Sequence, residues 1–206
     1  MSAQLKPIKV RGQGGPNPPK VAILLNELGL PYEIDPISFA DVKKPEYLAI
    51  NPNGRIPAIH DPNRGLTQWE SGAIIEYLIE VYDATYQLGF APGTPESFLA
   101  KQWLFFQVSG QGPYYGQAGW FLKFHAEKIP SAIKSYINEV NRVTGLLEGR
   151  LAQQKQKYGT NTGDGQWLVG NKYSFADIVF LSWQRTITKV TTKEQFCYDC
   201  NRLSNK

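Results

Sequence analysis

Residues 51–57, with the sequence NPNGRIP, form the segment around which the predicted elements of the chain are arranged. Gly54 permits a tight bend, and Pro57 holds Ile56 in an extended conformation while offering no N–H of its own. The Ile56–Pro57 bond is a candidate cis peptide, which would turn the backbone N–H and C=O of Ile56 outward. The segment is therefore expected to present an open backbone edge, along which an extended ligand pairs as an added strand.

A predicted helix begins shortly after this bend, at residues 69–71, Trp-Glu-Ser. Ser71 is expected to be its N-cap, because apolar residues follow at helical spacing. The free N–H groups and positive dipole of such a helix start favour a carboxylate, and Glu70 can accept an ammonium group. Together these groups would hold the head of an amino acid. On the alternative interpretation, Ser71 only caps its helix, Glu70 is solvated and Pro57 is a turn residue.

The two motifs resemble the glutathione site of glutathione S-transferases, especially the fungal group similar to the yeast nitrogen-repression regulator. The resemblance covers roughly residues 8–183. It implies an α/β plus all-α fold, with a thioredoxin-like glutathione-binding domain over residues 1–85. An all-helical domain over residues 94–206 would then hold the pocket for the second substrate. The family also implies a homodimer.

The order of predicted elements fits this fold class. The first half contains a strand at 7–10, a helix that Asn17 caps, a strand at 31–37, a short helix at 43–48 and a hairpin over 58–69. A linker is expected at 86–93, followed by a helix from Thr94, a break at 110–113, a long helix from Ser131 and a capping box at 174–177. The pattern is βαβ, then ββα, then helices.

The composition and charge of the chain argue against several classes of partner. The chain has 206 residues, 42% of them hydrophobic, and a net charge of +4 from scattered lysines and arginines, which disfavours nucleic acid as a partner. No apolar run approaches the roughly 18 residues that span a bilayer, so no membrane association and a cytoplasmic location are expected. The two cysteines, Cys197 and Cys200, form a C-x-x-C pair that we interpret as inert. Two distant histidines complete no metal site, so no metal is predicted.

The chemistry of the family requires a thiolate, and a cysteine thiol titrates near about pH 8.5. Lowering that pKa by about two units takes roughly 2.7 kcal/mol of preference for the anion. In the family, a residue after the first strand often donates a hydrogen bond to the sulfur, and the corresponding position here is Asn17. Its amide can donate but cannot take up the proton. Asn17 is therefore either a thiol donor or only an N-cap, and both interpretations stay open.

The resemblance also assigns the remaining site residues. Glutathione as cosubstrate would lie against the backbone of Ile56 beside Pro57, with Glu70 and Ser71 at its γ-glutamyl end. Arg55 and Lys43 would lie near its glycine carboxylate. Asn53 would also belong to the glutathione-binding residues, or alternatively only shape the turn. The second substrate, a hydrophobic small molecule, is expected against Tyr114, Gln117, Trp120, Phe121 and His125. The same side chains are alternatively core aromatics and surface charges.

Three functions are consistent with these sequence features. The first is a glutathione transferase acting on a hydrophobic electrophile, such as a fungal secondary metabolite. The second is a glutathione-dependent cis-trans isomerase of a conjugated alkene in a polyketide-type metabolite. The third is a non-catalytic glutathione-binding regulatory module. One departure from the family stands out, because residues 186–206 are short, polar and without clear periodicity where the family continues with helices.

Overall fold

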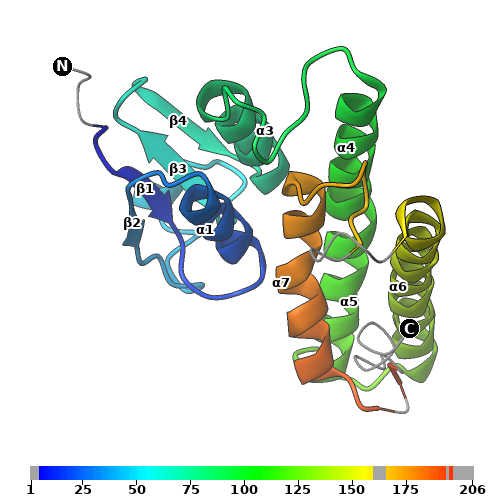
Figure 1. Cartoon of the computed structure of the whole chain (residues 1–206). Helices are drawn as coiled ribbons and strands as arrows, with labels where there is room; N and C mark the ends of the chain where they lie inside the picture. Colours follow the sequence, from blue (N-terminus) through cyan, green and yellow to red (C-terminus); the bar gives the residue numbers. More distant parts are fainter. Residues whose placement is uncertain (1–4, 160–165, 194, 197–206) are drawn as a thin grey trace.

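A mixed β-sheet forms the centre of the N-terminal half in a computed structural model that describes residues 5–159, 166–193, 195 and 196 (Figure 1). Its elements are, in order, β1 (Ile8–Arg11), α1 (Asn17–Glu27), β2 (Tyr32–Asp35), α2 (Pro45–Leu48), β3 (Ala58–Asp61), β4 (Leu66–Trp69) and α3 (Ser71–Tyr82). The strand order is β2-β1-β3-β4, in which only β1 and β2 are parallel. The predicted thioredoxin-like order is confirmed.

The C-terminal half is helical, which confirms the other part of the predicted fold class. It contains α4 (Pro95–Phe106), η1 (Gln107–Gln111), α5 (Gly112–Lys123), α6 (Pro130–Tyr158) and α7 (Phe175–Val190). The predicted break at 110–113 is wrong, because the single π-helical turn η1 joins α4 directly to α5. Pro113, which has no N–H to donate, follows this π-helical turn, where the regular hydrogen-bond pattern of the helix is already interrupted.

A buried capping box starts α7, as the sequence predicts. Asp177 accepts hydrogen bonds from the backbone N–H and the hydroxyl of Ser174, at 3.0 and 3.1 Å. Its other oxygen accepts from the N–H of Leu168 at 2.8 Å. One carboxylate therefore satisfies the helix start and also fixes the chain that leads into it.

The two halves share one hydrophobic core. Leu24 of α1 and Ile74 of α3 are fully buried in the same cluster as Leu104 of α4 and Ile178 of α7. Helix α1 packs against both α3 and α7, so α7, orange in Figure 1, lies along the boundary between the halves. The start of α1 is thereby held against the helical half.

Both predicted N-caps are wrong by one position. Pro16 occupies the cap of α1, and Asn17 is the first helical residue with no side-chain capping bond. Glu70 occupies the cap of α3, also without a side-chain bond, and Ser71 begins the helix. In both cases the residue predicted to cap has its side chain free for another partner.

The first residues of the stretch without clear periodicity, 186–190, are helical, since α7 continues as a regular helix to Val190. Cys197 and Cys200 lie outside the described residues. Across the part of the chain that the structure describes, we find no helix suited to crossing a bilayer. The same residues contain no group of three or more His, Cys, Asp or Glu side chains that could bind a metal ion.

Candidate active site

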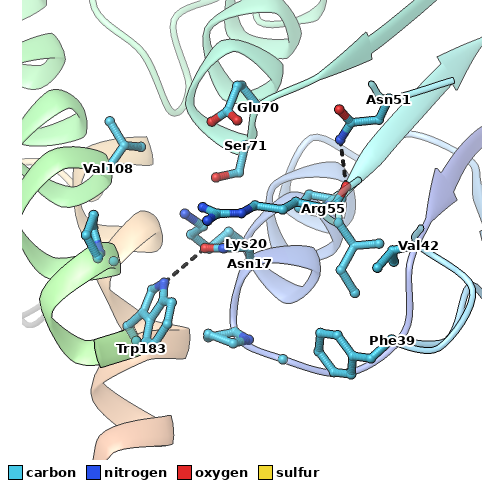
Figure 2. A pocket seen from close by; sticks show the side chains of 18 of the residues that line it. Asn17, Lys20, Phe39, Val42, Asn51, Arg55, Glu70, Ser71, Val108 and Trp183 are labelled. Carbon is cyan, nitrogen blue, oxygen red and sulfur yellow. Dashed lines mark hydrogen bonds between the residues drawn. The ribbon is translucent and has the colours of Figure 1, made fainter. Parts of the chain in front are cut away.

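A cavity of about 590 Å³ opens between the two halves of the molecule (Figure 2). One wall comes from the start of α1, the loop before β3 and the start of α3. The opposite wall comes from η1, α5 and α7. Of the predicted site residues, those that line it are Asn17, Arg55, Ile56, Pro57, Glu70, Ser71, Gln117 and Trp120.

The backbone edge at Ile56 has the predicted form. The Ile56–Pro57 bond is cis, and Gly54 adopts a φ of 60° in the preceding bend. The carbonyl of Arg55 is held by the Tyr47 hydroxyl at 2.8 Å and the Asn51 amide at 2.6 Å. Among the described residues, the N–H and C=O of Ile56 have no hydrogen-bond partner. A pair of backbone groups is thus available to a ligand that lies along this edge.

Glu70 and Ser71 lie at the start of α3, on the same side of the cavity as this edge. Glu70 has φ 72° and ψ 110°, a conformation that non-glycine residues rarely adopt and that tends to occur at functional sites. The Asn53 amide reaches the Glu70 carboxylate at 3.5 Å, and Ser71 is buried. The first N–H groups of α3 add a positive dipole end. These groups can hold an ammonium and a carboxylate at adjacent points.

Asn17 projects from the first turn of α1 toward α7 (Figure 2). Its Oδ1 accepts a hydrogen bond from the indole N–H of Trp183 at 2.9 Å. Since an indole can only donate, this contact fixes which end of the Asn17 amide is the oxygen. The NH₂ end is therefore left as a donor at the cavity.

A second polar chain in the cavity wall was not predicted. Lys20, one turn after Asn17 on α1, is only 1% exposed, and its Nζ donates to Oε1 of Gln107 at 2.8 Å. Gln107 in turn donates to Gln111 at 3.0 Å. Burial lowers the pKa of Lys20 to about 7, and the carboxylate of Glu70 opposes this shift.

The remaining predicted residues lie outside the cavity lining. Lys43 donates to the carbonyl of Asn53 at 3.0 Å, which ties the two together beside the bend. His125 contacts the backbone of Glu127 at 2.8 Å and stacks on Phe121, which also stacks on Tyr136. Tyr114 faces Tyr136 at a centroid distance of 6.4 Å. The structure thus divides the predicted second-substrate segment, placing Gln117 and Trp120 at the cavity and the other three aromatic residues away from it.

The cavity also has an apolar part, made by both halves of the molecule. Phe39, in the loop after β2, is 66% exposed, and Trp120 of α5 is 48% exposed. Val42, Val108 and Pro113 complete this lining. Because so much aromatic surface is left uncovered here, the cavity can accept an apolar molecule next to its polar edge.

Lys20, Gln107 and Trp183 are polar cavity residues that the sequence did not indicate, and Asn51 of the NPNGRIP segment also lines the cavity. A local signal existed for Lys20, since it stands at the edge of the apolar face that carries Leu24. No local signal existed for Gln107 or Trp183, which reach the cavity only through the packing of the helical half.

Comparison with known proteins agrees with this geometry. Residues 15–81 match the model of the glutathione S-transferase N-terminal domain, and residues 113–195 match that of the C-terminal domain. The chain is 61% identical over 192 residues to the glutathione S-transferase-like protein gedE of Aspergillus terreus, covering 93% of this chain and 84% of that protein. It is 57% identical over 190 residues to the similarly described tpcF of Aspergillus fumigatus, covering 92% and 83%.

Solved structures of the fungal group are similar over nearly the whole chain. The glutathione transferase URE2P6 of Phanerochaete chrysosporium, in complex with oxidized glutathione, has a TM-score of 0.85 and 44% identity, covering 99% of this chain and 90% of that one. Ure2p in complex with glutathione has a TM-score of 0.85 and 34% identity, covering 95% and 92%. The predicted resemblance, including its fungal group, is confirmed, and the chain belongs to the glutathione S-transferase family.

Proposed function

We propose that the protein is a glutathione transferase that adds the thiolate of glutathione to a hydrophobic electrophile. The observation that carries this proposal is the Asn17 amide. Its oxygen is occupied by Trp183, so its NH₂ group is the end available to a sulfur. Glutathione would lie along the Ile56 edge, with its γ-glutamyl end at Glu70 and Ser71. Arg55, exposed at the cavity, would lie near its glycine carboxylate.

The electrophile would occupy the apolar part of the cavity, between Phe39 and Trp120. An apolar molecule gains most of its binding free energy there from burial, while the thiolate is generated at the polar end. A fungal secondary metabolite of polyketide type fits this description. We also expect the protein to have domains at residues 1–85 and 94–206, to be located in the cytoplasm and to form a homodimer.

An isomerase would use the same site. Addition of the thiolate to a conjugated alkene turns a double bond into a single bond, which rotates, and elimination then returns the thiolate and the other geometric isomer. The relatives described as glutathione S-transferase-like are compatible with either outcome. A module that binds glutathione without turnover is the third candidate function, because the chain is also similar to Ure2p in complex with glutathione.

One experiment separates these functions. The protein is incubated with glutathione and either 1-chloro-2,4-dinitrobenzene or a cis-configured conjugated enone, and the products are identified by mass spectrometry and NMR. We expect covalent glutathione adducts. A trans enone formed without consumption of glutathione would instead show the isomerase. Calorimetric binding of glutathione with no product from either probe would show the non-catalytic module.

Asn17→Ala is expected to lower kcat/KM by about 10- to 100-fold, and to weaken glutathione binding at pH values where the bound thiol is ionised. The variant removes one hydrogen bond to an anion, worth about 1.5–3 kcal/mol, which forms fully only once the thiolate exists. Steady-state kinetics and calorimetry measure the two quantities. Asn26→Ala is the matched control, because Asn26 lies exposed near the other end of α1. Equal kinetics for the two variants would contradict the role of Asn17.

Trp183→Phe is expected to lower kcat/KM by about fivefold, because the Asn17 amide is then free to turn its oxygen toward the sulfur. The substitution keeps most of the buried aromatic ring and removes the N–H. Trp103→Phe serves as the control, since Trp103 of α4 packs against Phe106 and Phe180 outside the cavity. If both variants keep wild-type kinetics, the amide is oriented by something other than Trp183.

A further inference from the structure

The chain of amides beside Lys20 has a fixed polarity. The Nε2 of Gln111 donates to the backbone carbonyl of Phe180 at 3.4 Å, and a carbonyl can only accept. The Oε1 of Gln111 must therefore face Gln107, which donates to it, and the Oε1 of Gln107 must face Lys20. Gln107 and Gln111 are fully buried, so no water competes for these contacts. The structure thus presents an acceptor to Lys20 and no donor from this side.

Such an acceptor suits both protonation states of a lysine. An ammonium group and a neutral amine can each donate to Gln107, so the contact survives when Lys20 gains or loses a proton. When the amine is neutral, its lone pair has to point elsewhere. Lys20 lines the cavity together with Asn17 and Ser71, and Figure 2 shows the three around one opening.

When the thiolate forms, the thiol proton goes either to solvent or to a side chain of the cavity, and Asn17 cannot take it. The ionisable side chains among the described cavity residues are Lys20, Arg55 and Glu70. An arginine stays protonated, and Glu70 stands at the start of α3, where the ammonium of the γ-glutamyl group is expected. His60 is bonded to Thr67 and His125 to Glu127, and neither lines the cavity. Lys20 remains as the group that can accept a proton and return it.

We propose that Lys20 is the catalytic base that accepts the thiol proton of bound glutathione and holds it as an ammonium group beside the thiolate. This inference rests on the proposed function and adds a second catalytic residue to it. The low pKa of Lys20, about 7, supports it, because a substantial share of the amine is neutral under physiological conditions. The charged groups that face Lys20 around the cavity are Glu70 and Arg55; its neighbours from the helical half, Gln107 and Trp183, are neutral.

The proton balance closes in each reaction. The S–H bond breaks, its proton moves to the lone pair of Nζ, and the electron pair stays on sulfur. In conjugate addition, sulfur bonds to the β-carbon of the acceptor, and the ammonium returns its proton to the α-carbon. In substitution of an aryl chloride, sulfur bonds to the ring carbon that carries chlorine, the carbon–chlorine bond breaks, chloride leaves, and the proton passes from Lys20 to water. The amine is neutral again at the end of either cycle.

The test counts protons when glutathione binds to the whole protein. Calorimetry in two buffers with different ionisation enthalpies, at about pH 6 and about pH 8, gives the number released, and ultraviolet absorbance reports the bound thiolate. At the lower pH, Lys20 is already an ammonium, so thiolate formation should release about one proton per glutathione. At the higher pH the proton should stay on Lys20, and the net release should fall toward zero.

Two variants make the result decisive. Lys20→Met should lose the thiolate signal near neutral pH, and Lys20→Arg, which keeps the charge but no basic lone pair, should release about one proton at both pH values. Should Lys20→Met fail to fold, wild type and Lys20→Arg still separate a base from a fixed cation. Release of one proton at both pH values by the wild type, or an unchanged thiolate signal in Lys20→Met, overturns the proposal while glutathione binding stands. Absence of any glutathione binding overturns the proposed function, and this inference with it.

Discussion

Gly12→Ala is expected to lower the free energy of unfolding by about 3 kcal/mol or more, and to weaken glutathione binding with it. Gly12 follows β1 at a φ of 123°, which L side chains rarely adopt. An added Cβ would stand 2.6 Å from Cβ and 2.7 Å from Cγ2 of Ile56. Those atoms are fixed near the backbone, so the clash is relieved only by moving the Ile56 edge itself.

The control for this variant is Gly65→Ala in the β3–β4 turn. Gly65 also has a positive φ, 63°, but nothing lies within 4 Å of an added Cβ there. Its cost should be limited to backbone strain, about 1–2 kcal/mol. Urea unfolding gives the stabilities and calorimetry gives the glutathione affinity. If Gly12→Ala proves no less stable than Gly65→Ala, the packing of Gly12 on Ile56 does not hold the edge in place.

The Ile56 edge and the start of α3 were predictable because their signals are local. A glycine in a bend and a proline after an extended residue restrict the backbone wherever they stand, and the observed φ of Gly54 and the cis bond at Pro57 follow that logic. The cap assignments failed for a related reason. Asn17 and Ser71 are good N-cap residues in isolation, but each lies one position inside its helix, and the Asn17 side chain bonds to Trp183 far along the chain.

The polar network at Lys20 shows what local patterns leave out. A lysine next to an apolar helix face is usually a solvated residue whose stem lies along the surface. Here the helical half covers Lys20. Helix α1 packs on α7, and Gln107 of η1 accepts a hydrogen bond from the Nζ of Lys20. The helical turn that supplies Gln107 was predicted as the approach to a break. Placing a buried base at this point therefore requires knowing how the two halves pack.

His125 and Trp120 make the same point for the second substrate. Both belong to one aromatic segment, and sequence alone gives no reason to separate them. In the structure, Trp120 lies at the cavity with half of its surface free, whereas His125 is turned onto Phe121 and the backbone of Glu127. Trp120 faces the cavity because of its position around the axis of α5, whereas His125 lies beyond Lys123, where α5 ends.

The stability of the ligand-free protein is expected to rise with pH between about 7 and about 10 by an amount that depends on Lys20. The folded pKa is about 7, and an unfolded lysine titrates near about 10.4. Between these values the unfolded chain binds more protons, so raising the pH favours the folded state. The penalty for burying the charge is about 4 kcal/mol at pH 7, and about 2 kcal/mol of it should disappear by pH 9.

Lys20→Met isolates this contribution, because methionine has no charge to bury. The variant leaves Oε1 of Gln107 without its partner, which costs a similar amount at every pH, so its absolute stability decides nothing. The deciding quantity is the difference in unfolding free energy between wild type and Lys20→Met, measured by urea unfolding at about pH 7 and about pH 9, which should change by about 2 kcal/mol. Lys9→Met removes an exposed lysine from β1 and should keep the wild-type pH dependence. Parallel curves for wild type and Lys20→Met would mean that Lys20 is charged at neutral pH in the folded protein, and a charged Lys20 has no lone pair with which to take a proton from glutathione.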